Sequence, residues 1–329
     1  MTGQAAALGA AGGLIMMAAM DVISFGSVFL ELVFGHVPAL PEPGQEIFAK
    51  EFAISCGGAV TSATAAARVG AQAGVCTRLG DDLGGRVVAE HCERAGVDLS
   101  PSVRVSRQAT GITMVLNYDG DRSFVTHIPP VPETEQPELT RWTDVLRVHK
   151  PAWCYVHAGR GVAEFLRAAR QQGTKVLLDV SHNAIDQSGA AVLECIPLAD
   201  VFTPNRAELL HLTGAASIEA AVAAAGGWGT LTVVKMGADG ALMTGPDGVV
   251  HVSDGVAAIE VADLTGAGDS FGGALIGRLL QGAPLTSAVA AANSAGSAAA
   301  SRLGAVGPVH VEGLSMVIPA VPTTLEARP

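Results

Sequence analysis

The 329-residue chain is poor in charge, and its basic residues form no cluster. Charged residues make up 16% of the sequence, against roughly 25% in ordinary soluble domains. The 31 Asp and Glu outnumber the 20 Lys and Arg, for a net charge of −11. We therefore expect neither nucleic acid nor an anionic membrane surface as a partner. A bound phosphate would have to be held by backbone amides and isolated cations.

Cysteine is also scarce and without pattern. The chain has five cysteines without Cys-x-x-Cys spacing, and its nine histidines show no His-Glu-x-x-His or related spacing. The pattern predicts reduced thiols that fill a core, in a cytoplasmic protein, and no protein-bound transition metal.

The beginning of the chain, residues 1–19, has no charged residue and is rich in Ala and Gly. It lacks the positive region of a secretory signal. Asp21 and Glu31 interrupt the one stretch that approaches the roughly 20 apolar residues of a membrane span. We expect a disordered extension over 1–19, a single domain over 20–318 and a tail over 319–329.

Strand-like apolar runs alternate with longer amphipathic or Ala-rich runs over most of the remaining chain. This alternation predicts an α/β domain with a mostly parallel sheet. Three short strands outside the alternation predict a small second sheet: 103–105, 113–117 and 123–127. The other expected strands are 22–25 with 28–33, 47–54, 74–77, 153–156, 175–180, 201–202, 230–235, 240–243 and 249–252. The expected helices are 59–69, 83–95, 163–171, 207–212, 271–280 and 287–303.

The most informative motif is Asp-Leu-Thr-Gly-Ala-Gly-Asp-Ser-Phe at 263–271. It places a glycine turn before an apolar helical segment, with Asp269 at the junction. A helix N-terminus offers unpaired N–H groups and a positive dipole end to an anion. A carboxylate beside it could take a proton from an attacking hydroxyl. An ordinary capped turn has the same letters, so the motif alone leaves both interpretations open.

Other motifs precede this turn in a characteristic order. They are Cys-Gly-Gly-Ala at 56–59, Gly-Asp-Asp-Leu-Gly at 80–84, Thr-Pro-Asn-Arg-Ala-Glu at 203–208 and Val-Val-Lys-Met-Gly-Ala-Asp-Gly at 233–240. Together they resemble the PfkB/ribokinase family of carbohydrate and nucleoside kinases over essentially 21–309. The resemblance implies a three-layer ribokinase-like α/β domain with a mostly parallel central sheet. It also implies a small β lid over the acceptor, from about 35–56 and 102–128.

The resemblance further implies ATP-dependent phosphorylation of a hydroxyl, usually a hydroxymethyl group, on a small sugar, sugar derivative or nucleoside. Asp269 matches the general base, and the amides of Gly266, Ala267 and Gly268 match the anion hole. Asn205 and Glu208 match the motif that organises Mg²⁺ through water. A helix N-cap with Glu208 as its capping-box partner is the alternative interpretation of this pair, and both interpretations can hold at once.

The remaining expected site residues also follow from the resemblance. Lys235 either reaches phosphate or extends to the surface, Asn293 either lines the adenine pocket or packs within its helix, and Phe29 either stacks on the acceptor or fills core. Asp263 either completes a monovalent-cation site for K⁺ or braces the glycine loop. The nucleotide set is Asn205, Glu208, Lys235, Gly237, Gly240, Thr265 and Asn293; the acceptor set is Phe29, Glu31, Gly57, Gly58 and Ser62; the cation set is Asp263, Thr265, Ala299, Arg302 and Gly304.

Some positions depart from the family pattern. Phe29, Glu31 and Ser62 stand where many members carry Asn, Asp and Asn, which predicts that ribose is a poor acceptor. Pro308 lacks the hydroxyl that often completes the cation site. The lid strands either close over one site or pair with a second copy to form a homodimer. A non-catalytic sugar or nucleotide sensor on the same fold is the alternative function. A Rossmann dehydrogenase is disfavoured, because its glycine motif should follow the first strand.

Overall fold

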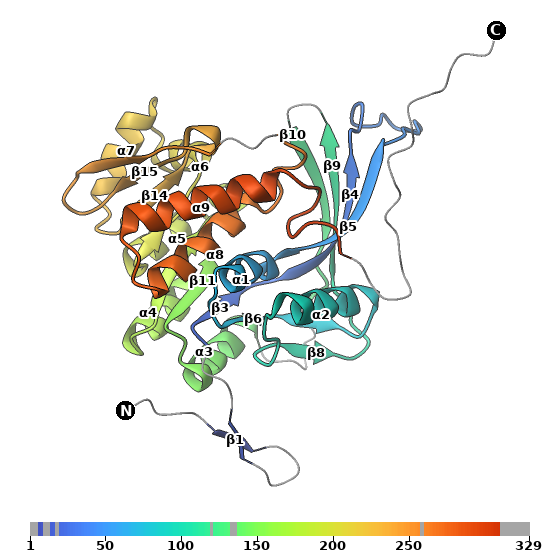
Figure 1. The fold of residues 1–329 in the computed structure, drawn as a ribbon, viewed down its shortest axis with the longest axis horizontal. Helices are drawn as coiled ribbons and strands as arrows, with labels where there is room; N and C mark the ends of the chain where they lie inside the picture. Colours follow the sequence, from blue (N-terminus) through green and yellow to red (C-terminus); the bar gives the residue numbers. More distant parts are fainter. Residues whose placement is uncertain are drawn as a thin grey trace.

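The computed structural model describes residues 6–8, 14–16, 20–118, 121–131, 137–256 and 260–309. Its centre is an eight-stranded sheet in the order β16-β15-β14-β13-β12-β11-β3-β6 (Figure 1). The strands from β6 to β14 are parallel, and β15 and β16 are antiparallel at one edge. The mostly parallel sheet is confirmed. Its strands are Val22–Phe25 (β3), Ala73–Cys76 (β6), Trp153–His157 (β11), Lys175–Asp179 (β12), Val201–Phe202 (β13), Leu231–Lys235 (β14), Ala241–Thr244 (β15) and Val250–Ser253 (β16).

Side-chain alternation along the strands divides the core into two layers. Tyr155 and Leu177 belong to one hydrophobic cluster, while Val156 and Leu178 belong to another on the opposite face of the sheet. One face carries α1 (Ala59–Arg68), α2 (Leu83–Ala95), α8 (Ala267–Leu280) and α9 (Leu285–Ala300), and the other carries α3 (Glu138–His149), α4 (Val162–Gln171) and α5 (His182–Cys195). Helices α6 (Arg206–Thr213) and α7 (Ile218–Gly226) pack against β14 and β15. The three layers match the expectation.

A second sheet forms the lid, in the order β10-β9-β4-β5. Strands β4 and β9 are parallel, and the other two pairs are antiparallel. The lid rises beside the end of α9 (Figure 1). Its strands are Val28–Gly35 (β4), Glu51–Gly58 (β5), Gly111–Tyr118 (β9) and Asp121–His127 (β10).

Two expected boundaries of the lid differ from the structure. Residues 28–33 belong to the lid rather than to the first core strand, because the chain leaves the core at Gly26, whose φ is 154°. The expected strand at 103–105 is β8, which pairs with β7 (Arg78–Gly80) in a separate two-stranded sheet.

Three helices, α3, α5 and α7, were not expected from the sequence. In α5 the apolar period is broken, and the backbone is non-helical at Ser188. Helix α8 begins at Ala267, four residues earlier than expected, because the glycines of the motif obscure its first turn. Helix α9 covers 285–300 rather than 287–303.

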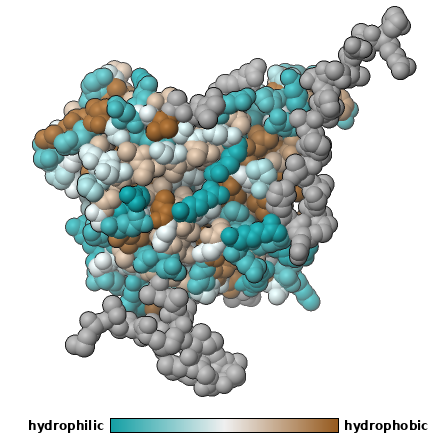
Figure 2. All heavy atoms as spheres, viewed as in Figure 1, coloured by the Kyte–Doolittle hydropathy of each residue, from teal (hydrophilic) through white to brown (hydrophobic). Residues whose placement is uncertain are grey.

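Most of the expected N-terminal extension lies outside the described residues. Ala6–Leu8 (β1) and Leu14–Met16 (β2) form a short antiparallel pair instead of the expected disorder. The expected tail at 319–329 lies outside the described residues. Figure 2 shows pale brown surface over α9, in keeping with the many alanines of that helix. In the described part no single helix could span a membrane by length and composition, although α6 and α7 taken as one bent pair could.

Candidate active site

One cavity of about 720 Å³ lies between the lid and the core. It opens at the carboxyl ends of β11, β12 and β14, the edge where ligands bind in parallel α/β sheets. Lid strands and the N-terminus of α8 form its other walls. The cavity brings together most of the expected site residues: Phe29, Glu31, Gly58, Asn205, Glu208, Lys235, Gly237, Gly240, Thr265, Gly266, Ala267, Gly268, Asp269 and Asn293.

Asp269 stands in the first turn of α8, and one of its carboxylate oxygens is held firmly. Its Oδ1 accepts hydrogen bonds from the Tyr155 hydroxyl at 2.8 Å and from His157 Nε2 at 3.0 Å. Burial favours the neutral acid, but the His157 hydrogen bond and charge lower the pKa of Asp269 below its usual range. The group is therefore a carboxylate at neutral pH. Its Oδ2 has no hydrogen-bond partner among the described residues, which leaves it available to an acceptor.

Two charged residues extend this network into the core. Tyr155 also donates to Asp179 Oδ2 at 2.7 Å, and Lys235 Nζ binds both oxygens of Asp179 at 2.8 and 2.9 Å. Burial disfavours the Lys235 ammonium, but Asp179 and Glu208 raise its pKa. The Lys235 side chain is 14% exposed, so it turns into the cavity wall rather than out to the surface.

The N-terminus of α8 presents unpaired amides to the cavity. The backbone hydrogen bonds at this turn use the amides of Ala267, to Leu264 at 3.3 Å, and of Ser270, to Gly266 at 2.9 Å. The amides of Gly266, Gly268 and Asp269 have no acceptor in the described part of the chain. Gly266 has φ 72°, and a Cβ there would approach the Cβ of Ala305 to 2.5 Å. The turn therefore requires glycine, and its unpaired N–H groups are donors of the kind that bind anions at helix N-termini.

Asn205 and Glu208 form a reciprocal cap at the start of α6. The Asn205 side chain accepts from the Glu208 amide at 2.8 Å, and Glu208 Oε2 accepts from the Asn205 amide at 2.7 Å. The capping interpretation is thus confirmed. Both residues also line the cavity, and burial raises the pKa of Glu208. Its second oxygen, Oε1, is not used by the cap, so the donor set fits an outer-shell position near Mg²⁺.

The end of the cavity beside α9 has an apolar wall. Val256, Val261 and Leu264 line it together with Gly296 and Ser297. Asn293 is 8% exposed and donates from Nδ2 to the Asp254 carbonyl at 3.0 Å. It therefore fixes the end of β16 against α9 and contributes to the wall.

The lid end of the cavity contains Glu31, which is 4% exposed. Its Oε2 accepts from the Ala305 amide at 3.0 Å. Burial, with some repulsion from Asp263 and Asp269, raises the pKa of Glu31 to about 7. Phe29 and Gly58 also line this end.

The other two residues of the expected acceptor set lie behind this wall. A Cβ on Gly57 would meet Glu31 Oε1 at 1.9 Å, so Gly57 makes room for that carboxylate. Ser62 is 1% exposed and its hydroxyl pairs with Ser24 at 2.9 Å. Neither residue is part of the cavity wall in this structure.

Asp263 braces the glycine loop. Its Oδ1 accepts from the Thr265 amide at 2.8 Å and its Oδ2 from the Gly304 amide at 2.9 Å. Two carbonyls of the expected cation set already accept backbone amides. Ala299 accepts from Arg302 at 3.3 Å and Gly304 from Gly307 at 3.0 Å. The interpretation that Asp263 braces the glycine loop is confirmed. Because two carbonyls of the cation set already accept amides, the set fits a bound cation only in part.

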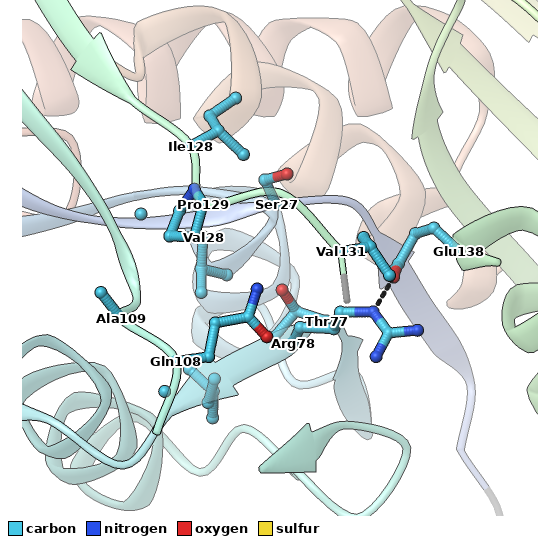
Figure 3. Close-up of a pocket in the computed structure, with 13 residues that line it drawn as sticks. Ser27, Val28, Thr77, Arg78, Gln108, Ala109, Ile128, Pro129, Val131 and Glu138 are labelled. Carbon is cyan, nitrogen blue, oxygen red and sulfur yellow. Dashed lines mark hydrogen bonds and ion pairs between the residues drawn. The ribbon is translucent and has the colours of Figure 1, made fainter. Parts of the chain in front are cut away.

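Two other features lie away from Asp269. A cavity of about 240 Å³ occupies the base of the lid, where Ser27, Gln108 and Pro129 surround it and Arg78 pairs with Glu138 (Figure 3). His182, Asp186 and His211 form an exposed cluster that bridges α5 and α6.

Sequence reasoning did not find Tyr155, His157 or Asp179. The first two lie on β11 and the third at the end of β12, far in sequence from α8. Gly159 and Gly161 follow His157, but these segments match none of the motifs that indicated the site. The order of the parallel strands brings the carboxyl ends of β11 and β12 together beside α8. A polar residue at the end of an apolar strand was the one signal in the sequence that could have indicated them. All five cysteines are free and buried, as expected.

Solved structures share this architecture. Arabidopsis thaliana ribokinase complexed with ribose and ATP matches with a TM-score of 0.71 at 23% identity, over 89% of this chain and 96% of that one. A putative ribokinase II from E. coli in complex with ATP and Mg²⁺ matches with a TM-score of 0.72 at 22% identity, over 87% and 94%. The fold is therefore the ribokinase-like α/β fold.

Sequence comparison then establishes the family. The model of the pfkB family carbohydrate kinases matches residues 21–311, and the chain belongs to this family. Aminoimidazole riboside kinase of Salmonella typhimurium strain LT2 is 28% identical over 263 residues, 73% of this chain and 80% of that protein. The protein is thus a carbohydrate kinase, a phosphotransferase with an alcohol acceptor. This confirms the expected enzyme class over the sensor and dehydrogenase alternatives.

Proposed function

We propose that this kinase transfers the γ-phosphoryl group of ATP to a hydroxyl, usually a hydroxymethyl group, on a small sugar, sugar derivative or nucleoside. The observation that carries the proposal is the juxtaposition, in one cavity, of Asp269 Oδ2 with the amides of the α8 N-terminus, all without a hydrogen-bond partner among the described residues. A base and an anion hole at one turn are what phosphoryl transfer to an alcohol needs.

In the proposed mechanism, Glu31 and the lid hold the acceptor so that its hydroxyl meets Asp269 Oδ2. The hydroxyl oxygen attacks the γ-phosphorus, its proton passes to Asp269, and ADP leaves. The amides of Gly266, Gly268 and Asp269 and the α8 dipole stabilise charge on the transferred group. His157 and Tyr155 hold the other oxygen of the base in place.

Mg²⁺ would be held near Asn205 and Glu208 through water, where it neutralises charge on the nucleotide phosphates. The apolar wall beside Asn293 would take the adenine. A K⁺ site at Asp263, Thr265, Ala299, Arg302 and Gly304, and a homodimer through the lid strands, remain proposals. K⁺ against Na⁺ in the assay tests the first, and light scattering tests the second.

The proposal is tested by acceptor-dependent ADP release with ATP and Mg²⁺ over a panel of sugars and nucleosides. We expect release with at least one acceptor and none without acceptor. Ribose should be a poor acceptor, because the Phe29 ring offers no hydrogen bond to a hydroxyl buried against it. No release with any member of a broad panel would contradict the proposed reaction.

A further inference from the structure

The lid carries a cation that the proposed transfer does not use. Arg122 on β10 lines the cavity beside Phe124. The carbon at the centre of its guanidinium group stands 5.6 Å from the centre of the Phe124 ring. Its Nε is buried and has no hydrogen-bond partner in the described part of the chain. Buried N–H groups normally find an acceptor, because leaving such a bond unmade costs free energy.

A second unpaired donor lies directly across the strand pair. Asn117 on β9 is opposite Arg122 in the antiparallel ladder, so both side chains leave the same face of the lid. Asn117 is 7% exposed, and its Nδ2 is buried without a partner among the described residues. Guanidinium and amide N–H groups that have no protein acceptor fit an oxygen-rich anion.

The charged side chains of the cavity wall show which cation has no carboxylate partner. Four carboxylates line it, those of Glu31, Asp179, Glu208 and Asp269. Lys235 is already bound by both oxygens of Asp179. Of the described arginines and lysines in the wall, Arg122 is the one without a carboxylate partner. A neutral acceptor would leave that charge uncompensated beside the apolar ring of Phe124.

We infer that Arg122 and Asn117 bind an anionic group of the acceptor, a carboxylate or a phosphate ester. The inference rests on the proposed function and narrows its acceptor to anionic sugars or nucleosides. Thr113 is opposite Glu31 in the lid, and Asn117 follows four residues later. Four residues of strand span about 14 Å. The anionic group therefore lies at the end of the acceptor remote from the reacting hydroxyl.

The test compares acceptors that share a hydroxymethyl group and differ in one anionic group. Orotidine against uridine tests a carboxylate, and ribose 1-phosphate against ribose tests a phosphate. Arg122→Gln removes the charge, and Asn117→Asp supplies Arg122 with a partner inside the protein. Arg147→Gln, which removes an exposed charge from α3, is the control. ADP release gives KM and kcat, and calorimetry with a non-hydrolysable ATP analogue gives affinity without turnover.

We expect the wild type to prefer the anionic member of at least one pair. Arg122→Gln and Asn117→Asp should each raise the KM and Kd of that member about 10- to 100-fold. The neutral member and the Arg147→Gln enzyme should change less than about twofold. The inference is overturned if the wild type has the same KM and Kd for both members of each pair. It is also overturned if Arg122→Gln raises the KM and Kd of the neutral and the anionic member equally. If no acceptor releases ADP, the proposed function fails, while calorimetry still decides whether the lid binds an anion.

Discussion

His157 Nε2 lies 3.0 Å from Asp269 Oδ1, the oxygen that the Tyr155 hydroxyl also contacts. The ring is half-exposed at the end of β11, and the carboxylate begins α8. One oxygen of the proposed base is thus fixed by two side chains, while the other has no partner in the described part of the chain. Asp269 is held in one orientation, and its ionisation depends on a residue that no motif indicated.

The first prediction concerns the base. Asp269→Asn should lower kcat about 10²- to 10⁴-fold, because the amide cannot take the acceptor proton. Nucleotide binding should persist, since the α8 amides remain. Single-turnover kinetics and calorimetry with an ATP analogue measure the two effects. Asp247→Asn, on an exposed turn, is the control, and near wild-type chemistry in Asp269→Asn would refute the role.

The second prediction concerns pH. His157→Gln removes the main interaction that holds the pKa of Asp269 below its usual range. That pKa should therefore rise, and the acid limb of the kcat/KM profile should move to higher pH. His251→Gln, on β16, should leave the profile in place. A His157→Gln profile that coincides with the wild type would show that the hydrogen bond does not tune the base.

The third prediction separates capping from metal organisation. Glu208→Gln keeps an oxygen that can accept the Asn205 amide, so the cap should survive and the melting temperature should change little. The lost charge should raise the Mg²⁺ concentration needed for half-maximal activity several-fold. Ser217→Ala, which weakens the cap of the neighbouring α7, is the control for stability alone. Unchanged Mg²⁺ dependence in Glu208→Gln would leave only the capping role.

The fourth prediction concerns Glu31, whose pKa is raised from 4.5 to about 7 by burial. A carboxyl whose pKa is higher when folded destabilises the folded state as pH rises. The cost is absent below 4.5 and complete above about 7. The unfolding free energy of Glu31→Gln minus that of the wild type should therefore increase by about 2–3 kcal/mol as the pH rises from 5 to 8. Urea unfolding measures this, and exposed Glu46→Gln should show no such gain.

The turn at Asp269 could be predicted because its signal is local. Asp269 and the glycines lie within four residues, so one short motif contains both the proposed base and the amides. The pairing of Asp269 with His157 depends on strand order, which no short window contains. The start of the lid was misplaced because β3 and β4 form an almost continuous apolar run, and only the backbone at Gly26 separates them. Glu31 was expected at the acceptor, but its contact with Ala305 is visible only in the folded chain.

The hydrogen bond from the Ala305 amide to Glu31 joins residues 274 positions apart. Nearby, Ser55 Oγ donates to the Gly307 carbonyl at 2.9 Å, and the Val309 amide donates to the Ile54 carbonyl at 2.8 Å. The segment from Ala305 to Val309 thus fastens lid strands β4 and β5, which are among the first strands made during synthesis. A nascent chain lacks these contacts until this late segment has left the ribosome, so the lid gains its fastening to the rest of the domain only late in synthesis.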